Sequence, residues 1–280
     1  MMENREFKYK IENKRYHTWN YYLRDKFGTK VFKVSINAGF TCPNIDGSIS
    51  YGGCAYCSKD GSGDFAGNPR DNLVKQFKDI KEMMEKKWPQ AKYIGYFQAF
   101  TNTYAPLEVL KDKYETILDQ DGVVGLSIST RPDCIDDDIL DYLAELNTRT
   151  NLWVELGLQT VHDQTSNIIN RGHGLDVFVD CVNRLRSREI EVVAHVINGL
   201  PGETYDMMME TIRRVSHMDI QGVKIHLLHV IKGTPMVNML NKGELKLLSK
   251  EEYVDLVCDQ LEILPQEMVI HRLTGDGKKE

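Results

Sequence analysis

The sequence predicts an α/β fold, a partial (β/α)6 barrel of the TIM type with a parallel sheet and an N-terminal helical extension. Strand-like and helix-like segments alternate along the chain, an order that builds parallel sheets through right-handed crossovers. The length of 280 residues, with 41% hydrophobic residues, suits one α/β barrel. Polar side chains also follow the ends of most predicted strands, where such barrels place their chemistry.

The N-terminal extension, residues 1–29, combines basic and aromatic side chains. A helix is expected over residues 16–27, where Trp19, Tyr22 and Leu23 recur at helical spacing, and Gly28 is placed to end it. This composition can serve RNA, because aromatic rings stack on bases and cations bind phosphates. It also fits a solvated helix whose aromatic side packs on the barrel. Both interpretations stay open.

The barrel core, residues 30–230, follows as strand–helix units. Apolar runs bounded by turn residues predict strands, and apolar residues three to four apart predict helices. The strands are expected at 30–37, 92–98, 122–129, 152–159, 190–197 and 222–228, and the helices at 71–87, 106–119, 136–147, 162–169, 174–187, 203–217 and 249–263. The C-terminal part, residues 231–280, holds the last helix and a candidate seventh strand at 268–272. No linker interrupts the chain, so a single domain over residues 1–280 is expected.

The formal net charge is −6. This charge argues against a protein coated with nucleic acid, although not against a local basic face. The N-terminus is charged and lacks the apolar stretch of a secretory leader, and no apolar run reaches membrane-spanning length. A cytoplasmic protein without a membrane partner is therefore expected.

Three of the six cysteines lie in one glycine-rich loop directly after the first strand. Cys42, Cys54 and Cys57 are spaced Cys-x11-Cys-x2-Cys. Three thiolates on a [4Fe–4S] cluster would leave one iron free for another ligand. A zinc loop completed by a distant residue, or a Cys-x-x-Cys redox pair with a bystander, remains an alternative.

Further chemistry-bearing residues gather at the predicted strand ends. Because the carboxyl ends of parallel strands meet at one rim, these side chains are expected beside the three thiols. The residues singled out there are Gln98, Arg131, Cys134, Gln159, Asn198, Gly199 and His229, and Arg171 follows a short helix.

Several segments together resemble the radical S-adenosylmethionine (radical SAM) superfamily, over nearly the whole chain. They are the cysteine loop and the runs STRPD (129–133), ELGLQT (155–160), NRGHG (170–174) and NGLPGET (198–204). The most frequent cysteine spacing in that superfamily is Cys-x3-Cys-x2-Cys. The longer gap here and the run YFQAFTNTYAP (96–106) are similar to the YtqA/YhcC family, in the branch of the Elongator catalytic subunit.

This resemblance implies cofactors and residue roles. It implies that Cys42, Cys54 and Cys57 hold a [4Fe–4S] cluster, and that S-adenosylmethionine binds the open iron and yields a 5′-deoxyadenosyl radical. By the same resemblance, Gln98 contacts the methionyl amino group, Arg131 or Arg171 the carboxylate, Gln159 and Asn198 the ribose, and the backbone at Gly199 and Gly202 the adenine. No catalytic residue is assigned; Cys134 and His229 are candidates for substrate contact.

The resemblance also implies partners and a reaction. The expected substrate is tRNA, whose wobble uridine would have its 5-carboxymethylaminomethyl group trimmed to aminomethyl, and a partner methyltransferase would then act. An electron donor such as flavodoxin or ferredoxin is expected. The chain ends at Glu280, soon after residues 271–277, where relatives continue, and it leaves no room for the acetyltransferase domain of the Elongator subunit. Two alternatives remain, namely a radical enzyme acting on a small metabolite or peptide, and a non-enzymatic zinc-binding module.

Overall fold

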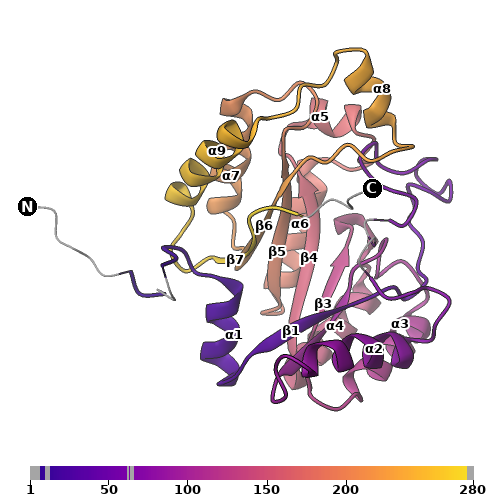
Figure 1. Ribbon diagram of the computed structural model, residues 1–280. Coiled ribbons are helices and arrows are strands. Elements are labelled where there is room, and N and C mark those ends of the chain that lie inside the picture. Colours follow the sequence, from indigo (N-terminus) through magenta and orange to yellow (C-terminus); the bar gives the residue numbers. More distant parts are fainter. Residues whose placement is uncertain (1–6, 10–12, 62, 64–65, 276–280) are drawn as a thin grey trace, which may run out of the picture.

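A curled, half-barrel sheet of seven parallel strands organises the computed structural model, which describes residues 7–9, 13–61, 63 and 66–275 (Figure 1). The strands pair in chain order, each with the next: β1 (Val31–Ile36), β2 (Lys92–Phe97), β3 (Val123–Thr130), β4 (Asn151–Gln159), β5 (Glu191–Asn198), β6 (Gly222–Leu227) and β7 (Val269–Arg272). The predicted fold class is confirmed, and the candidate seventh strand pairs with β6.

The helices α2, α3, α4, α6, α7 and α9 cover the outer face of the sheet, whereas α5 lies near α8 at the carboxyl ends of the strands. Outward-facing strand residues such as Ile36, Phe97 and Ile128 are fully buried in the main apolar core. The helices are α1 (Trp19–Phe27), α2 (Leu73–Glu85), α3 (Leu107–Leu118), α4 (Asp137–Arg149), α5 (Asp163–Ile168), α6 (Leu175–Arg186), α7 (Tyr205–Ser216), α8 (Pro235–Asn241) and α9 (Lys250–Ile263), with a 3-10 turn at Pro132–Cys134. Helix α8 was not expected from the sequence.

The N-terminal segment closes the barrel at the amino ends of the strands. Thr18 forms a parallel bridge with Ile270 at the free edge of β7, and the Tyr22 hydroxyl donates to the side chain of Asn151 at the start of β4. The rings of Trp19 and Tyr22 stack, and both meet Trp153 edge-on. The aromatic side of α1 is therefore packed on the barrel, as the second interpretation of its composition holds, and these two rings are not available for base stacking.

The inner face of the sheet is layered. Near the amino ends it is apolar, with Val31, Ile94, Trp153 and Val193 buried against α1. The next layer is charged, and its centre is Glu155 of β4, which has no exposed surface. Above it, at the carboxyl ends of the strands, lies the cysteine loop. Because successive side chains of a strand point to opposite faces, the inner face carries charged groups directly beneath the three thiols.

No helix within the described residues is both long and apolar enough to span a membrane.

Candidate functional site

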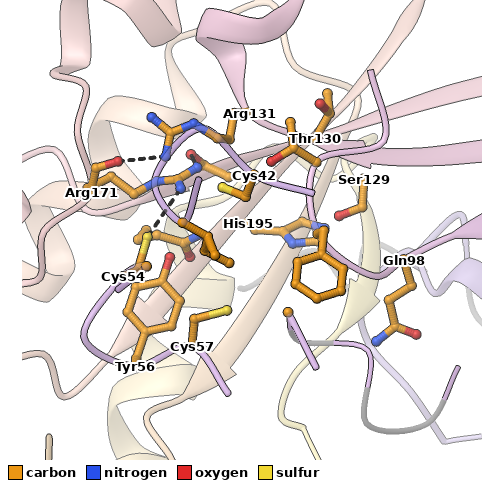
Figure 2. Close-up of a pocket in the computed structure, with 17 residues that line it drawn as sticks. Cys42, Cys54, Tyr56, Cys57, Gln98, Ser129, Thr130, Arg131, Arg171 and His195 are labelled. Atoms are coloured by element: carbon orange, nitrogen blue, oxygen red, sulfur yellow. Dashed lines mark hydrogen bonds between the residues drawn. The ribbon is translucent and has the colours of Figure 1, made fainter. Parts of the chain in front are cut away.

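The three cysteines of the loop after β1 line one cavity of about 110 Å3, which we call the cysteine cavity. Figure 2 shows their side chains approaching this space from different sides. Cys42, Cys54 and Cys57 form no disulfide. The structure therefore brings together the three thiols that the sequence groups.

The loop is held by the segment that follows α5, on the other side of the cavity. The Asn44 side chain donates to the carbonyl of Asn170 at 2.5 Å, and the Asn170 side chain donates to the carbonyl of Gly53 at 2.9 Å. The backbone N–H of Ala55 donates to the carbonyl of Ile169 at 2.8 Å. Ile169 and Asn170, at the start of the run NRGHG, thus hold the cysteine loop in place.

Arg171 contacts a cysteine directly. Its guanidinium donates to the Cys54 sulfur at 3.7 Å and to the carbonyl of Gly157 at 2.7 Å, while its Nε is buried without a partner. Asn44 also donates to the Cys54 sulfur, at 3.5 Å. Two N–H donors therefore reach the Cys54 sulfur, the kind of contact that metal-binding thiolates receive from surrounding residues.

Arg131 lines the cavity, but most of its donors are already used. It makes a bidentate pair with Asp133, at 2.9 and 2.7 Å, and donates to the carbonyl of Arg171 at 2.8 Å. A Cβ on Gly172 would lie 2.6 Å from the Asn44 oxygen and 3.2 Å from this guanidinium, and the φ of Gly172 is +78°. Any residue other than glycine at this position would displace the side chain of Asn44 or Arg131.

Gln98 and Gln159 lie where the cysteine cavity opens inward, together with Ser129. Gln159 has a φ of +73°, and the pairing of β4 with β5 shifts register at this point. Phe100, also on the cavity wall, has a φ of +63°. Such conformations cost energy in residues other than glycine and concentrate at functional sites. Positive φ angles at two residues of the cavity wall make it a candidate binding site.

Two expected cofactor contacts lie elsewhere. The Asn198 side chain exchanges two hydrogen bonds of 2.9 Å with Gln260 of α9, on the outer face of the sheet. Gly199 lines a separate cavity of about 610 Å3, between the loop after β5 and the start of α9, and so does Gly202. The structure thus does not bring the Asn198 side chain, or the wall at Gly199, to the cysteine cavity.

The two candidates for substrate contact differ in position. Cys134 ends the 3-10 turn after β3 and contacts Asp133; burial and the nearby carboxylate raise the pKa of its thiol to about 12, which keeps it protonated. His229 follows β6, and its ring lies 3.0 Å from the carbonyl of Gly275. It lines a second cavity of about 200 Å3, which we call the inner cavity.

Glu155 gathers donors from four strands beneath the two cavities. Lys33 and Ser127 donate to one carboxylate oxygen, and His195 at 2.6 Å and Lys224 at 3.1 Å to the other. Burial alone would raise its pKa, but Lys224, Lys33 and His195 hold the pKa of Glu155 well below its usual range. Burial, together with Lys224, lowers the pKa of His195 to about 4, so this ring is neutral near pH 7.

Several site residues were not singled out from the sequence. Tyr56, inside the cysteine loop, lines both cavities, and Lys224 and Arg272 line the inner one. A signal for the lysines existed: Lys33 and Lys224 interrupt the apolar runs of β1 and β6, where a charge has to be paired or functional. Asn44 and Asn170 carried no such signal, because Asn is common in loops.

The donors fit the cofactors that the resemblance implied. Soft thiolates suit iron–sulfur centres, and three of them around one cavity leave an iron coordination site for another ligand. Within the described part of the chain, no three His, Cys, Asp or Glu side chains lie close enough together to hold a single metal ion. The orphaned Nε of buried Arg171 offers a cation to a carboxylate beside the thiols.

Comparison with known proteins agrees with this chemistry. A model of the radical SAM superfamily matches residues 49–215, and a model of a radical SAM C-terminal domain matches residues 220–280. The protein YtqA of Bacillus subtilis (strain 168) is 60% identical over 280 residues, which cover all of this chain and 87% of the relative. The protein YhcC of Escherichia coli (strain K12) is 35% identical over 258 residues, 92% of this chain and 82% of the relative.

More distant matches extend to proteins named for tRNA chemistry. A tRNA uridine(34) acetyltransferase of Methanocaldococcus infernus is 26% identical over 156 residues, which cover 55% of this chain and 29% of the relative. The solved structure of Elp3 from the same archaeon, with an N-terminal deletion, superposes with a TM-score of 0.64 at 18% identity. The match covers 87% of this chain and 56% of that chain, and it shows a shared fold.

Proposed function

Because the chain belongs to the radical SAM superfamily and, within it, to the YtqA/YhcC family, we propose that it is a radical enzyme whose substrate is the wobble uridine of tRNA. The family establishes the two cofactors, a [4Fe–4S] cluster and S-adenosylmethionine. When bound, they supply a 5′-deoxyadenosyl radical. The open question is the substrate that meets this radical.

The residues of this chain bind and orient these cofactors in the proposal. Cys42, Cys54 and Cys57 would hold three irons and leave the fourth to the methionyl group. In this proposal Arg171 would bind the methionine carboxylate, which its unpartnered Nε supports, whereas Arg131, paired with Asp133, has fewer donors left. Gln98 and Gln159 lie between the thiols and the inner cavity, where amide groups can orient the cofactor toward a substrate.

The observation that carries the tRNA proposal is the similarity, over more than half of the chain, to proteins named as tRNA uridine(34) acetyltransferases. The proposed reaction removes the two-carbon arm of a 5-carboxymethylaminomethyl group and leaves aminomethyl. It balances if S-adenosylmethionine is the two-electron oxidant and water supplies an oxygen. The products are then the aminomethyl nucleoside, glyoxylate, methionine and 5′-deoxyadenosine.

A radical enzyme acting on a small metabolite or peptide is the second candidate. The small size of the two joined cavities, about 110 and 200 Å3, and the net charge of −6 favour it. A single uridine can also enter such a space, since enzymes that modify a base take it out of its stack.

Anaerobic reconstitution with iron and sulfide tests the proposal. The reconstituted chain is given tRNA bearing carboxymethylaminomethyl-uridine, or the same tRNA bearing the aminomethyl product, and the release of 5′-deoxyadenosine and of glyoxylate is measured. We expect release only with the first tRNA, and conversion of its nucleoside by mass spectrometry. Absence of tRNA-dependent release, with the cluster present, would overturn the tRNA assignment and leave the radical chemistry in place.

The partners of the reaction are also proposals. A flavodoxin or ferredoxin would reduce the cluster before the first turnover, since the balanced reaction consumes no external electron, and a methyltransferase would use the aminomethyl product. In a strain lacking this chain, the carboxymethylaminomethyl nucleoside should accumulate.

A further inference from the structure

The inner cavity continues the cysteine cavity toward the middle of the half-barrel. The two share five wall residues, among them Gln98, Gln159 and His195. A group bound in the inner cavity would therefore lie next to the place where the radical forms. The substrate's reacting part has to occupy this space, so its chemistry indicates what the substrate carries.

The charges around the inner cavity are unbalanced. Among the residues that the structure describes, its wall contains Lys224 and Arg272 and no Asp or Glu. The described carboxylate beneath it is Glu155, which is already shared by Lys33 and Lys224. Within the described residues, three cations thus face this one anion, with Lys224 buried and Arg272 exposed, and this excess of positive charge favours binding of a further negative charge.

Arg272 has no counterion in the part of the chain that the structure describes. Among the residues that the structure describes, no hydrogen bond or ion pair engages its guanidinium. It lies at the carboxyl end of β7, near the ring of His226. A Cβ built on Gly275 would be 3.8 Å from its NH1 and 3.7 Å from the Nδ1 of His226. These two groups therefore border the same small space, and both can present N–H donors to it.

The pKa of the neighbouring His226 reflects the same excess of positive charge. Burial, followed by His195, Lys224 and Arg272, lowers the pKa of His226 well below its usual range. The ring is neutral near pH 7 and donates through one nitrogen only. An Arg beside a neutral His, over a buried Lys, suits a planar carboxylate, because the guanidinium fork matches its two oxygens.

We infer that the inner cavity is an anion subsite in which Arg272 binds a carboxylate of the substrate, with Lys224 and His226 beside it. This inference rests on the proposed function, and specifies the part of the substrate that the cavity selects. The carboxymethyl arm ends in such a carboxylate. Binding it at Arg272 directs the methylene between nitrogen and carboxylate toward Gln98 and the cysteine cavity.

Paired substrates test the inference with the reconstituted full chain. The kcat/KM values are measured on tRNA carrying the carboxymethylaminomethyl group and on tRNA carrying its neutral methyl ester. Arg272→Met should lose about tenfold to a hundredfold on the acid, as expected for one charge-assisted contact, and little on the ester. Arg272→Lys should recover part of the loss. Arg213→Met, at an exposed arginine of α7 paired with Glu210, is the matched control. Equal losses on acid and ester, or no loss, would overturn the inference.

A chemical test separates this inference from the tRNA proposal. Phenylglyoxal modifies accessible arginines, and peptide mass spectrometry reports the rate at Arg272 in the reconstituted protein. Acetate should slow the modification, and acetamide should not. Protection by acetate without any turnover of tRNA would uphold the subsite and reject the tRNA substrate. Turnover of tRNA without protection would reject the subsite. Stronger protection by inorganic phosphate than by acetate would also reject a carboxylate subsite, in favour of a phosphate group.

Discussion

Replacing Glu155 by Gln tests the charged layer on which both cavities rest. The carboxylate has no exposed surface and accepts hydrogen bonds from Lys33, Ser127, His195 and Lys224. Glutamine keeps the size of the side chain but offers one acceptor oxygen and no charge. Two buried ammonium groups would then lack their counterion.

The expected loss in the free energy of unfolding follows from the two lysines that would lose their counterion. Removing one partner of a buried ion pair costs about 3–5 kcal/mol. Part of this cost is relieved, because burial lowers the pKa of Lys33 to about 8. At pH 7 this lysine can therefore lose its proton for about 1.4 kcal/mol, the equivalent of one pKa unit. We expect Glu155→Gln to lower the free energy of unfolding by about 3–4 kcal/mol at pH 7.

The pH dependence has a definite sign. In the variant the folded-state pKa of Lys33 falls below 8, while the unfolded value stays near 10.5. Between these two pKa values the unfolded chain binds more protons than the folded one, so the stability of the variant rises with pH. By pH 9 Lys33 is largely neutral in both folded proteins, and the difference between them should shrink by up to about 1.4 kcal/mol.

Urea unfolding of the metal-free chain, followed by tryptophan fluorescence at pH 7 and pH 9, measures both effects. Glu115→Gln is the matched control. Its carboxylate pairs with Arg149 at the surface, where each side chain is about two-fifths exposed, so it should cost less than about 1 kcal/mol. If Glu155→Gln costs no more than this control, or if its cost does not shrink by pH 9, the reasoning fails.

Three further outcomes are expected. Cys54→Ser should lose iron and visible absorbance after reconstitution, whereas Cys258→Ser, at an exposed thiol of α9, should keep both; equal iron contents would contradict the assignment. Arg171→Met removes a hydrogen bond to the Cys54 sulfur, so a redox titration should give a more negative reduction potential, and an unchanged potential would refute the contact. At pH 8 iodoacetamide should alkylate Cys258 well before Cys134, whose thiol pKa is raised to about 12, and the rate at Cys134 should climb with pH; comparable rates by peptide mass spectrometry would contradict its burial.

Much of the fold was accessible from sequence because the periodic signals are strong. The strands and most helices begin and end within a few residues of their expected bounds, and the weakest run, 268–272, does pair with β6. Helix α8 escaped because it has only seven residues, too short a stretch for a periodic pattern to stand out. A Pro at its first turn, after Thr234, is the local signal for such a start.

The site was only partly accessible. Cys42, Cys54 and Cys57 lie close together in the sequence, and Arg171 lies in the run NRGHG. The structure puts all four around one cavity. Asn198 shows the limit: in a strand, one residue of register decides which face a side chain takes, and here the amide faces Gln260. The pairing of Lys33 with Glu155 joins residues 122 positions apart, a proximity that no local pattern encodes.

The hydrogen bonds that hold the cysteine loop bear on how the protein would respond to oxygen. Asn44, Asn170 and the backbone of Ala55 tie the loop to the opposite strand connection through nitrogen and oxygen atoms alone. Oxidative loss of a cluster would leave these hydrogen bonds in place. We therefore expect the cluster-free loop to keep its three sulfurs near the cavity, so that rebuilding the cluster would need no refolding of the loop.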